Sequence, residues 1–229
     1  MNDFRHPKDG YVFIVTYGRS GSTLLQRLVN AIPGVMVRGE NNNALLPLFK
    51  SWQALTQSPD IGRMRAQGLT SDATHPWFGA ERIDTDAYGH TLCRGFAAQV
   101  LRPQANLRVC GFKEIRTIAQ STEYRAYLEF KRRFFPNARF VFNTRDSAAV
   151  ARSSWWRSHD PADVMAMIHT AEAVFRGFVA TYPDRSIMLH YDSYIADHGA
   201  FGPLFDLLGD QPSRADLRAI MTQRLIHAT

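Results

Sequence analysis

The hydrophobic residues of this 229-residue chain alternate between short apolar runs and longer stretches with helical spacing. Runs rich in β-branched and aromatic residues are typical of buried strands, and helical stretches between them are typical of the crossovers that join parallel strands. We therefore predict an α/β fold, a single-domain three-layer sandwich over residues 1–229 with a central parallel sheet. The predicted strands span residues 11–16, 107–112, 138–143 and 186–191.

Local signals mark other elements. Asp160 and Pro161 fit the N-cap and the first position of a helix, and apolar residues follow them at helical spacing. Residues 213–216 resemble a capping box at the start of a last helix. The stretch 57–84 is rich in Gly, Pro and polar residues and is expected to be irregular, as is 117–122. The longer stretch is either a lid or acceptor-binding loop or a plain surface excursion.

The first apolar run breaks into a glycine loop and then enters a helix. A strand, a glycine loop and a helix N-terminus together form a phosphate site, because the loop amides point inward and the helix dipole favours an anion. An arginine in the loop adds a forked cation, and the hydroxyl side chains add donors. We therefore predict a P-loop-like phosphate-binding loop made of Gly18, Arg19, Ser20, Gly21, Ser22 and Thr23.

This loop differs from the two common nucleotide-binding loops. A Walker A sequence has Gly where this chain has Thr16, and Lys where it has Ser22. The loop is not a GxGxxG sequence either, which argues against a dinucleotide. A second motif follows the strand predicted at 138–143: the chain runs into Arg145, and Ser153 comes eight residues later.

Both motifs resemble those of the sulfotransferase family. Residues 18–24 are similar to the loop that takes the 5′-phosphosulfate of 3′-phosphoadenosine 5′-phosphosulfate (PAPS), and Arg145 with Ser153 is similar to the 3′-phosphate motif. Segment 186–195 resembles a later family strand, which implies that Tyr191 contacts the nucleotide. The loop has Arg where the cytosolic small-molecule branch uses Lys. In this it resembles the tyrosylprotein, carbohydrate and bacterial branches more closely.

The resemblance implies an enzyme that moves the sulfuryl group from PAPS to a hydroxyl acceptor by in-line transfer, giving PAP and a sulfate ester. PAPS would be the co-substrate, with no metal. A tyrosine, a sugar, a lipid or a secondary metabolite would each fit as acceptor. Many family members close the adenine site with a Gly- and Lys/Arg-rich C-terminal segment, which this chain lacks. Two alternatives stay open: a P-loop-type kinase with a degenerate loop, and a non-catalytic PAP-binding domain.

In-line sulfuryl transfer needs a cation at the bridging oxygen and a base for the acceptor proton. Arg19 is the first candidate for the cation, and Lys113, in a GFKE segment similar to those of bacterial sulfotransferases, is the second. Glu40 is the predicted base, because its placement resembles that of the catalytic Glu of the tyrosylprotein branch. The alternative is that Glu40 has no catalytic role and only stabilises the start of a helix through the helix dipole. Glu114 and His75 are the next candidates. Neighbours on an extended chain point opposite ways, so Lys113 and Glu114 cannot both face the sulfate without a bend.

Charge narrows the choice of partners. The net charge of +6 suits a ligand with several negative charges. The basic triplet 131–133 is expected to be a solvated helix end before Pro136. Because no basic stripe with interleaved aromatic residues is present, we expect no nucleic-acid partner. Trp155 and Trp156 either stack on adenine, line the acceptor pocket or pack on the core.

Composition sets the expected location. The chain has no run of 18 apolar residues, so no membrane span is expected. Its first ten residues are polar, which predicts no signal peptide. Cys93 and Cys110 have no metal or redox spacing and are expected to be reduced, buried thiols. We therefore expect a cytoplasmic protein, with a homodimer left open.

Overall fold

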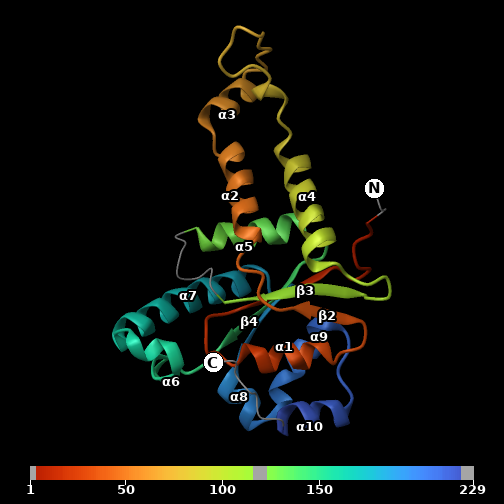
Figure 1. Cartoon of the computed structure of the whole chain (residues 1–229), viewed down its shortest axis with the longest axis vertical. Coiled ribbons are helices and arrows are strands. Elements are labelled where there is room, and N and C mark those ends of the chain that lie inside the picture. The colour runs from red at the N-terminus through yellow and green to blue at the C-terminus, as the bar shows by residue number, and fades with distance from the viewer. Residues whose placement is uncertain (1–3, 116–122, 223–229) are drawn as a thin grey trace.

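A computed structural model of the protein describes residues 4–115 and 123–222. Its sheet has five parallel strands in the order β2-β3-β1-β4-β5, with β1 at the centre (Figure 1). The predicted α/β sandwich with a central parallel sheet is confirmed. The strands are β1 (Tyr11–Val15), β2 (Val35–Arg38), β3 (Val109–Glu114), β4 (Arg139–Thr144) and β5 (Ser186–His190).

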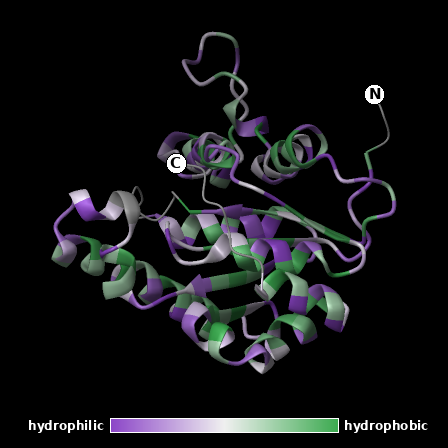
Figure 2. Ribbon diagram, turned by 60° about the horizontal axis from the view of Figure 1, so that its bottom comes forward, coloured by the Kyte–Doolittle hydropathy of each residue, from purple (hydrophilic) through white to green (hydrophobic). Residues whose placement is uncertain are grey.

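Helices cover both faces of the sheet, as Figures 1 and 2 show. The chain's apolar residues accordingly form two large core clusters, one on each face. The face packed through Val12 and Ile14 carries α1 (Ser22–Asn30), α8 (Tyr191–Ala196), a 3₁₀ turn (His198–Phe201), α9 (Gly202–Leu208) and α10 (Arg214–Thr222). The face packed through Phe13 carries α2 (Leu45–Thr56), α4 (Thr85–Phe96), a π-turn (Ala97–Leu101), α5 (Tyr124–Phe134) and α7 (Pro161–Thr181). Short elements α6 (Ser147–Ala151) and a 3₁₀ turn (Ser154–Ser158) link β4 to α7.

A helical arm stands away from the sheet at the top of Figure 1. Helices α2 and α4 form its two sides, and α3 (Pro59–Ala66) with a 3₁₀ turn (Ala80–Arg82) lies near its end. The prediction that 57–84 is irregular is therefore wrong for α3: the Ser58 side chain caps this helix by accepting the Ile61 N–H, and Pro59 occupies the first turn. The other stretch, 117–122, lies outside the described residues. Within the described ranges, no helix is long and apolar enough to cross a membrane.

The charged residues Lys113 and Glu114 lie inside β3, whereas the sequence placed the end of this strand at residue 112. Both side chains are almost fully buried. The strand continues because each of its two charges has a buried or half-buried partner of opposite sign. Period-two alternation sends the two side chains to opposite faces of the sheet.

Lys131 corrects the expectation of a solvated helix end. It lies on the sheet-facing side of α5, is fully buried, and its Nζ donates to Glu114 Oε2 over 2.8 Å. The rings of Phe13, Phe112 and Tyr127 surround the ammonium group, with the Tyr127 centroid 4.4 Å away. Burial lowers the pKa of Lys131, while the Glu114 carboxylate favours the charged form.

The buried phenols and thiols predict that the protein loses stability at alkaline pH. Burial raises the pKa of Tyr11, Tyr17, Tyr124, Tyr127, Tyr194 and Cys93, and that of Cys110 to about 11. Above pH 9 to 10 the unfolded chain releases protons that the folded chain keeps, so each group lowers the unfolding free energy by about 1.4 kcal/mol per pH unit. Lys131, whose pKa is lowered in the folded chain, makes the unfolding free energy rise with pH, but it is one group against the seven that make it fall.

Urea unfolding at successive pH values should therefore show a midpoint that falls as the pH rises above about 9. Tyr124→Phe removes one of the titrating groups and should make the fall shallower. A midpoint that stays level or rises over this range would contradict the prediction.

Candidate active site

One cavity opens at the carboxyl ends of the strands, where ligands bind in parallel α/β sheets. Its volume is about 210 Å³, and segments that follow each of the five strands contribute to its wall. Glu40 comes after β2, Ile115 after β3, Arg145 after β4 and Tyr191 after β5. The full lining is Gly18, Arg19, Gly21, Ser22, Thr23, Glu40, Lys113, Ile115, Arg145 and Tyr191.

The loop between β1 and α1 is anchored through its carbonyl oxygens. Trp156 Nε1 donates to Gly18 O (3.2 Å), Arg145 Nη1 to Arg19 O (3.0 Å) and Asn143 Nδ2 to Ser20 O (2.8 Å). Because N–H and C=O point in opposite directions across a trans peptide, the N–H groups that follow these carbonyls point away from the anchors. The loop can therefore offer successive backbone donors to an anion.

Two left-handed residues shape this loop. Arg19 has φ 68° and Gly21 has φ 81°. A side chain at Gly21 would also collide with Tyr191, because an added Cβ would lie 2.0 Å from a ring carbon. Glycine at position 21 thus lets α1 begin directly against the Tyr191 ring.

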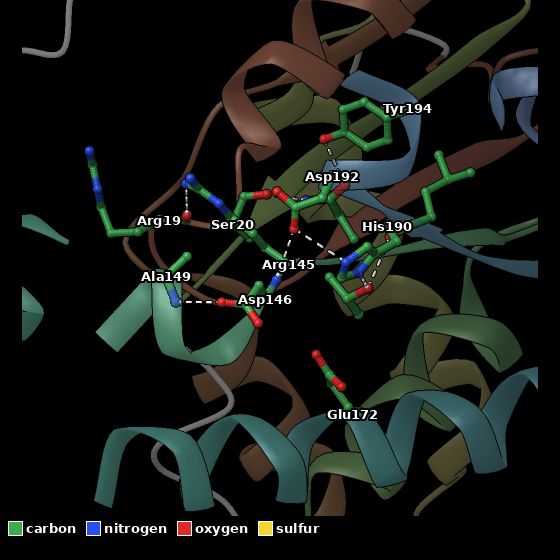
Figure 3. A network of polar contacts seen from close by, with 12 residues as sticks. Arg19, Ser20, Arg145, Asp146, Ala149, Glu172, His190, Asp192 and Tyr194 are labelled. Atoms are coloured by element: carbon green, nitrogen blue, oxygen red, sulfur yellow. Dashed lines mark hydrogen bonds and ion pairs between the residues drawn. The ribbon is translucent and has the colours of Figure 1, made fainter. Parts of the chain in front are cut away.

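Arg145 is held on several sides. Its guanidinium lies over the Tyr191 ring, 4.6 Å from the centroid. Its backbone N–H donates to the Tyr17 hydroxyl (2.9 Å), which in turn donates to Glu172 Oε1 (2.7 Å). The Nε atoms of Arg145 and Arg19 are buried and have no hydrogen-bond partner within the described part of the chain. Figure 3 shows Arg145 reaching the backbone of Arg19. Both arginines line the cavity and bring positive charge to it, which suits an anion.

Lys113 and Glu40 form an ion pair at the cavity wall, with Nζ and Oε1 3.0 Å apart. The Lys113 side chain is only 8% exposed, whereas that of Glu40 is 31% exposed. Glu40 therefore keeps contact with solvent while a nearly buried cation stands beside it. A carboxylate and an ammonium at this distance supply both an acceptor of protons and a positive charge.

A sequence profile of the sulfotransferase family matches residues 11–201 of the chain. The protein belongs to the sulfotransferase family.

Solved structures agree with the fold of this sulfotransferase. It is similar to a sulfotransferase domain from the Synechococcus PCC 7002 olefin synthase, with 20% identity, a TM-score of 0.60, and coverage of 97% of this chain and 80% of that one. It is also similar to a sulfotransferase domain from the curacin biosynthetic pathway, with 16% identity, a TM-score of 0.56, and coverage of 96% and 80%. A search of curated proteins finds no match.

Most of the predicted site residues of this sulfotransferase share the cavity, but three do not. The Ser20 hydroxyl is buried 2.7 Å from Thr16 Oγ1, so it belongs to the loop's support. The Ser153 hydroxyl donates to Val150 O (2.8 Å). The Glu114 carboxylate lies on the opposite face of the sheet with Lys131 and Tyr127, as strand alternation requires.

Other predicted aromatic and histidine positions are also placed. His75 is exposed near the end of the arm, where its Nδ1 accepts the Trp77 N–H, and it does not line the cavity. Trp156 packs in the core and bonds the loop, which agrees with the core alternative for this residue. The side chain of Trp155 lies outside what the structure describes.

Sequence reasoning missed the residues that hold the site together. Thr16 donates to Asn143 O (2.6 Å), and Tyr194 donates from its hydroxyl to Asn143 Oδ1 (3.1 Å). Asn143 is fully buried near the end of β4, so a polar residue inside an apolar run was the available signal. Tyr17 gave no such signal, because its role depends on α7 reaching it from more than 150 residues away in sequence.

Proposed function

We propose that this sulfotransferase takes its sulfuryl group from PAPS and transfers it in line to a hydroxyl acceptor, giving PAP and a sulfate ester. The observation that carries the proposal is the shared cavity, which brings the anchored loop, Arg145 and the Lys113–Glu40 pair to one opening. A bisphosphorylated nucleotide needs two anion sites, and a transfer reaction needs a base and a cation between donor and acceptor.

The nucleotide would be held at both ends. The loop 18–23 with Arg19 would bind the 5′-phosphosulfate at the start of α1. Arg145, which lines the cavity, would bind the 3′-phosphate through its guanidinium donors, over the face of Tyr191. Ser153 would join it only after its hydroxyl leaves Val150 O, which a rotation about its side-chain bond permits.

The acceptor side would lie at Glu40. In the transfer the acceptor oxygen forms a bond to sulfur, the bond from sulfur to the bridging phosphate oxygen breaks, and PAP leaves with that electron pair. The Glu40 carboxylate takes the acceptor proton, and Lys113 and Arg19 meet the charge that develops on the bridging oxygen. The proposal assigns no metal ion to the reaction, because these cations supply the positive charge.

Two measurements test this function. Calorimetric titration should show that PAP binds more tightly than AMP, which lacks the 3′-phosphate. Incubation with ³⁵S-labelled PAPS and acceptor extracts should give a labelled ester and PAP. Tighter binding of Mg²⁺–ATP with phosphorylated product would support a kinase instead. Tight binding of PAP with no product from any extract would support a non-catalytic binding domain.

Gly21→Ala should weaken PAP binding by about tenfold or more. The new Cβ needs space that the Tyr191 ring occupies, and alanine disfavours the positive φ at this position. Both effects move the loop relative to Arg145. Gly95→Ala is the matched control, because a Cβ there meets nothing within 4 Å and Ala favours the helix. Equal PAP affinity in the two variants, measured by calorimetry, would show that the loop geometry does not govern binding.

A further inference from the structure

The buried hydroxyl group of Tyr17 holds the backbone of Arg145. It lies 2.9 Å from the Arg145 backbone nitrogen and 3.1 Å from the Arg145 carbonyl oxygen. Arg145 follows the last residue of β4 and precedes α6, so it belongs to neither element. The conformation of the chain at this point therefore depends on side chains that meet its backbone polar groups, and Tyr17 meets both of them.

Glu172 sets the direction of the Tyr17 hydroxyl proton. A phenol has one proton, and its two acceptors here are Glu172 Oε1 at 2.7 Å and Arg145 O at 3.1 Å. The carboxylate is the closer and the charged acceptor, so it takes the proton and leaves an oxygen lone pair for the Arg145 N–H. Burial and the bond to Glu172 raise the pKa of Tyr17, so the phenol keeps this proton at neutral pH.

Glu172 is itself fixed on α7. Its side chain is only 17% exposed, and its second oxygen, Oε2, lies 3.5 Å from Nη1 of Arg176, one turn further along the helix. Figure 3 shows the Glu172 side chain rising from its helix on the side where Arg145 and Asp146 lie. Through Tyr17, α7 thus reaches the strand end that carries Arg145.

Helix α8 holds the same strand end from another direction. The N–H of Asp146 donates to Asp192 Oδ2 (3.1 Å), and Asp192 is the neighbour of Tyr191. The backbone at Arg145 is therefore tied to α7 on one side and to α8 on the other. This arrangement keeps the Arg145 guanidinium over the Tyr191 ring.

We propose that Tyr17 and Glu172 are positioning residues that hold Arg145 in place for the 3′-phosphate, an inference that rests on the proposed function. Neither residue lines the cavity, so both act through the Arg145 backbone and not by contact with the nucleotide. A small rotation of that backbone displaces the guanidinium at the end of its long side chain. Binding of a phosphate at a fixed distance from the loop is sensitive to such a displacement.

Tyr17→Phe keeps the buried ring and removes only the hydroxyl. It should weaken PAP binding about tenfold, the cost of roughly one unmade hydrogen bond, and change AMP binding by less than about twofold. Tyr182→Phe is the matched control, because its hydroxyl donates to Glu129 Oε2 (3.0 Å) and neither residue lines the cavity. Calorimetry measures the ratio of PAP to AMP affinity, which a loss of stability alone does not change. An equal ratio in the wild type and Tyr17→Phe would overturn the proposal.

Glu172 should act through Tyr17. Glu172→Ala should weaken PAP binding about threefold, whereas Glu172→Gln, whose amide oxygen can accept the same bond, should recover most of the affinity. The double variant Tyr17→Phe with Glu172→Ala should bind PAP as Tyr17→Phe alone does, since the carboxylate has no hydroxyl left to orient. Effects that add in the double variant would show that Glu172 does not act through Tyr17.

Hydrogen exchange of the Arg145 amide, followed by NMR, tests the contact without a nucleotide. The amide should exchange at least about tenfold faster in Tyr17→Phe than in the wild type, and at the wild-type rate in Tyr182→Phe. An unchanged rate in Tyr17→Phe would overturn the proposal even if nucleotide binding changed. A wild type that binds PAP no more tightly than AMP would instead contradict the proposed function, so the two failures are distinguishable.

Discussion

Glu40→Gln should lower kcat by a factor of about 10² to 10⁴ while PAP binds with nearly unchanged affinity. The carboxylate is the group of the cavity that can accept a proton beside Lys113, and it is partly open to solvent. Glutamine keeps the size of the side chain and its hydrogen-bonding capacity but cannot take the proton. Single-turnover kinetics with labelled PAPS measure the chemical step.

Glu114→Gln is the matched control for this variant. It makes the same chemical change in a carboxylate on β3 that faces the core and bonds Lys131. It should reduce stability, because it leaves the Lys131 ammonium without its buried counter-charge, but the folded fraction should keep its kcat. If Glu114→Gln lost turnover and Glu40→Gln kept it, the base would have to be reassigned, and loss in neither variant would point to His75.

Arg145→Ala should weaken PAPS binding by about 10²-fold, since charge-assisted bonds to a phosphate are among the strongest available. Affinity for adenosine 5′-phosphosulfate, which lacks the 3′-phosphate, should change much less. The ratio of the two dissociation constants is therefore the decisive quantity. If this ratio were the same in the variant as in the wild type, Arg145 would not bind the 3′-phosphate.

Two further variants sharpen that measurement. Arg145→Lys keeps the charge but loses the fork and the flat face that lies on Tyr191, so it should recover only part of the affinity. Arg218→Ala removes the same charge from an exposed position on α10. It should leave both constants unchanged at physiological salt, because an exposed charge acts only over a screened distance.

Sequence patterns were informative where chemistry and local structure coincide. The anion loop could be predicted because its glycines, hydroxyls and arginine are contiguous and follow an apolar strand. Lys113 and Glu40 could be named one by one, but their 3.0 Å contact could not, because it depends on β2 pairing with β3 at the sheet edge. Strand alternation did separate Lys113 from Glu114 correctly.

Long-range contacts explain what the sequence did not reveal. Lys131 follows Tyr124, Tyr127 and Leu128 on the sheet-facing side of α5, but a charged residue there is normally taken as solvated. Lys131 can be buried because the Glu114 carboxylate, which comes from β3, accepts a hydrogen bond from its ammonium group inside the core. The helix in the arm was not predicted for a different reason. Residues 57–84 are rich in Gly and Pro, which is typical of irregular structure, yet eight of them form α3. Nor could spacing reveal that the Ser153 hydroxyl already has a local acceptor.

The bond from Arg145 to the carbonyl of Arg19 has a consequence for how the enzyme would measure its ligand. One hydrogen bond thus links the two proposed anion sites before any nucleotide arrives. A molecule whose two anionic groups had another spacing would have to break this bond. Discrimination by length would then depend on a side chain that touches neither the sulfur atom nor the acceptor.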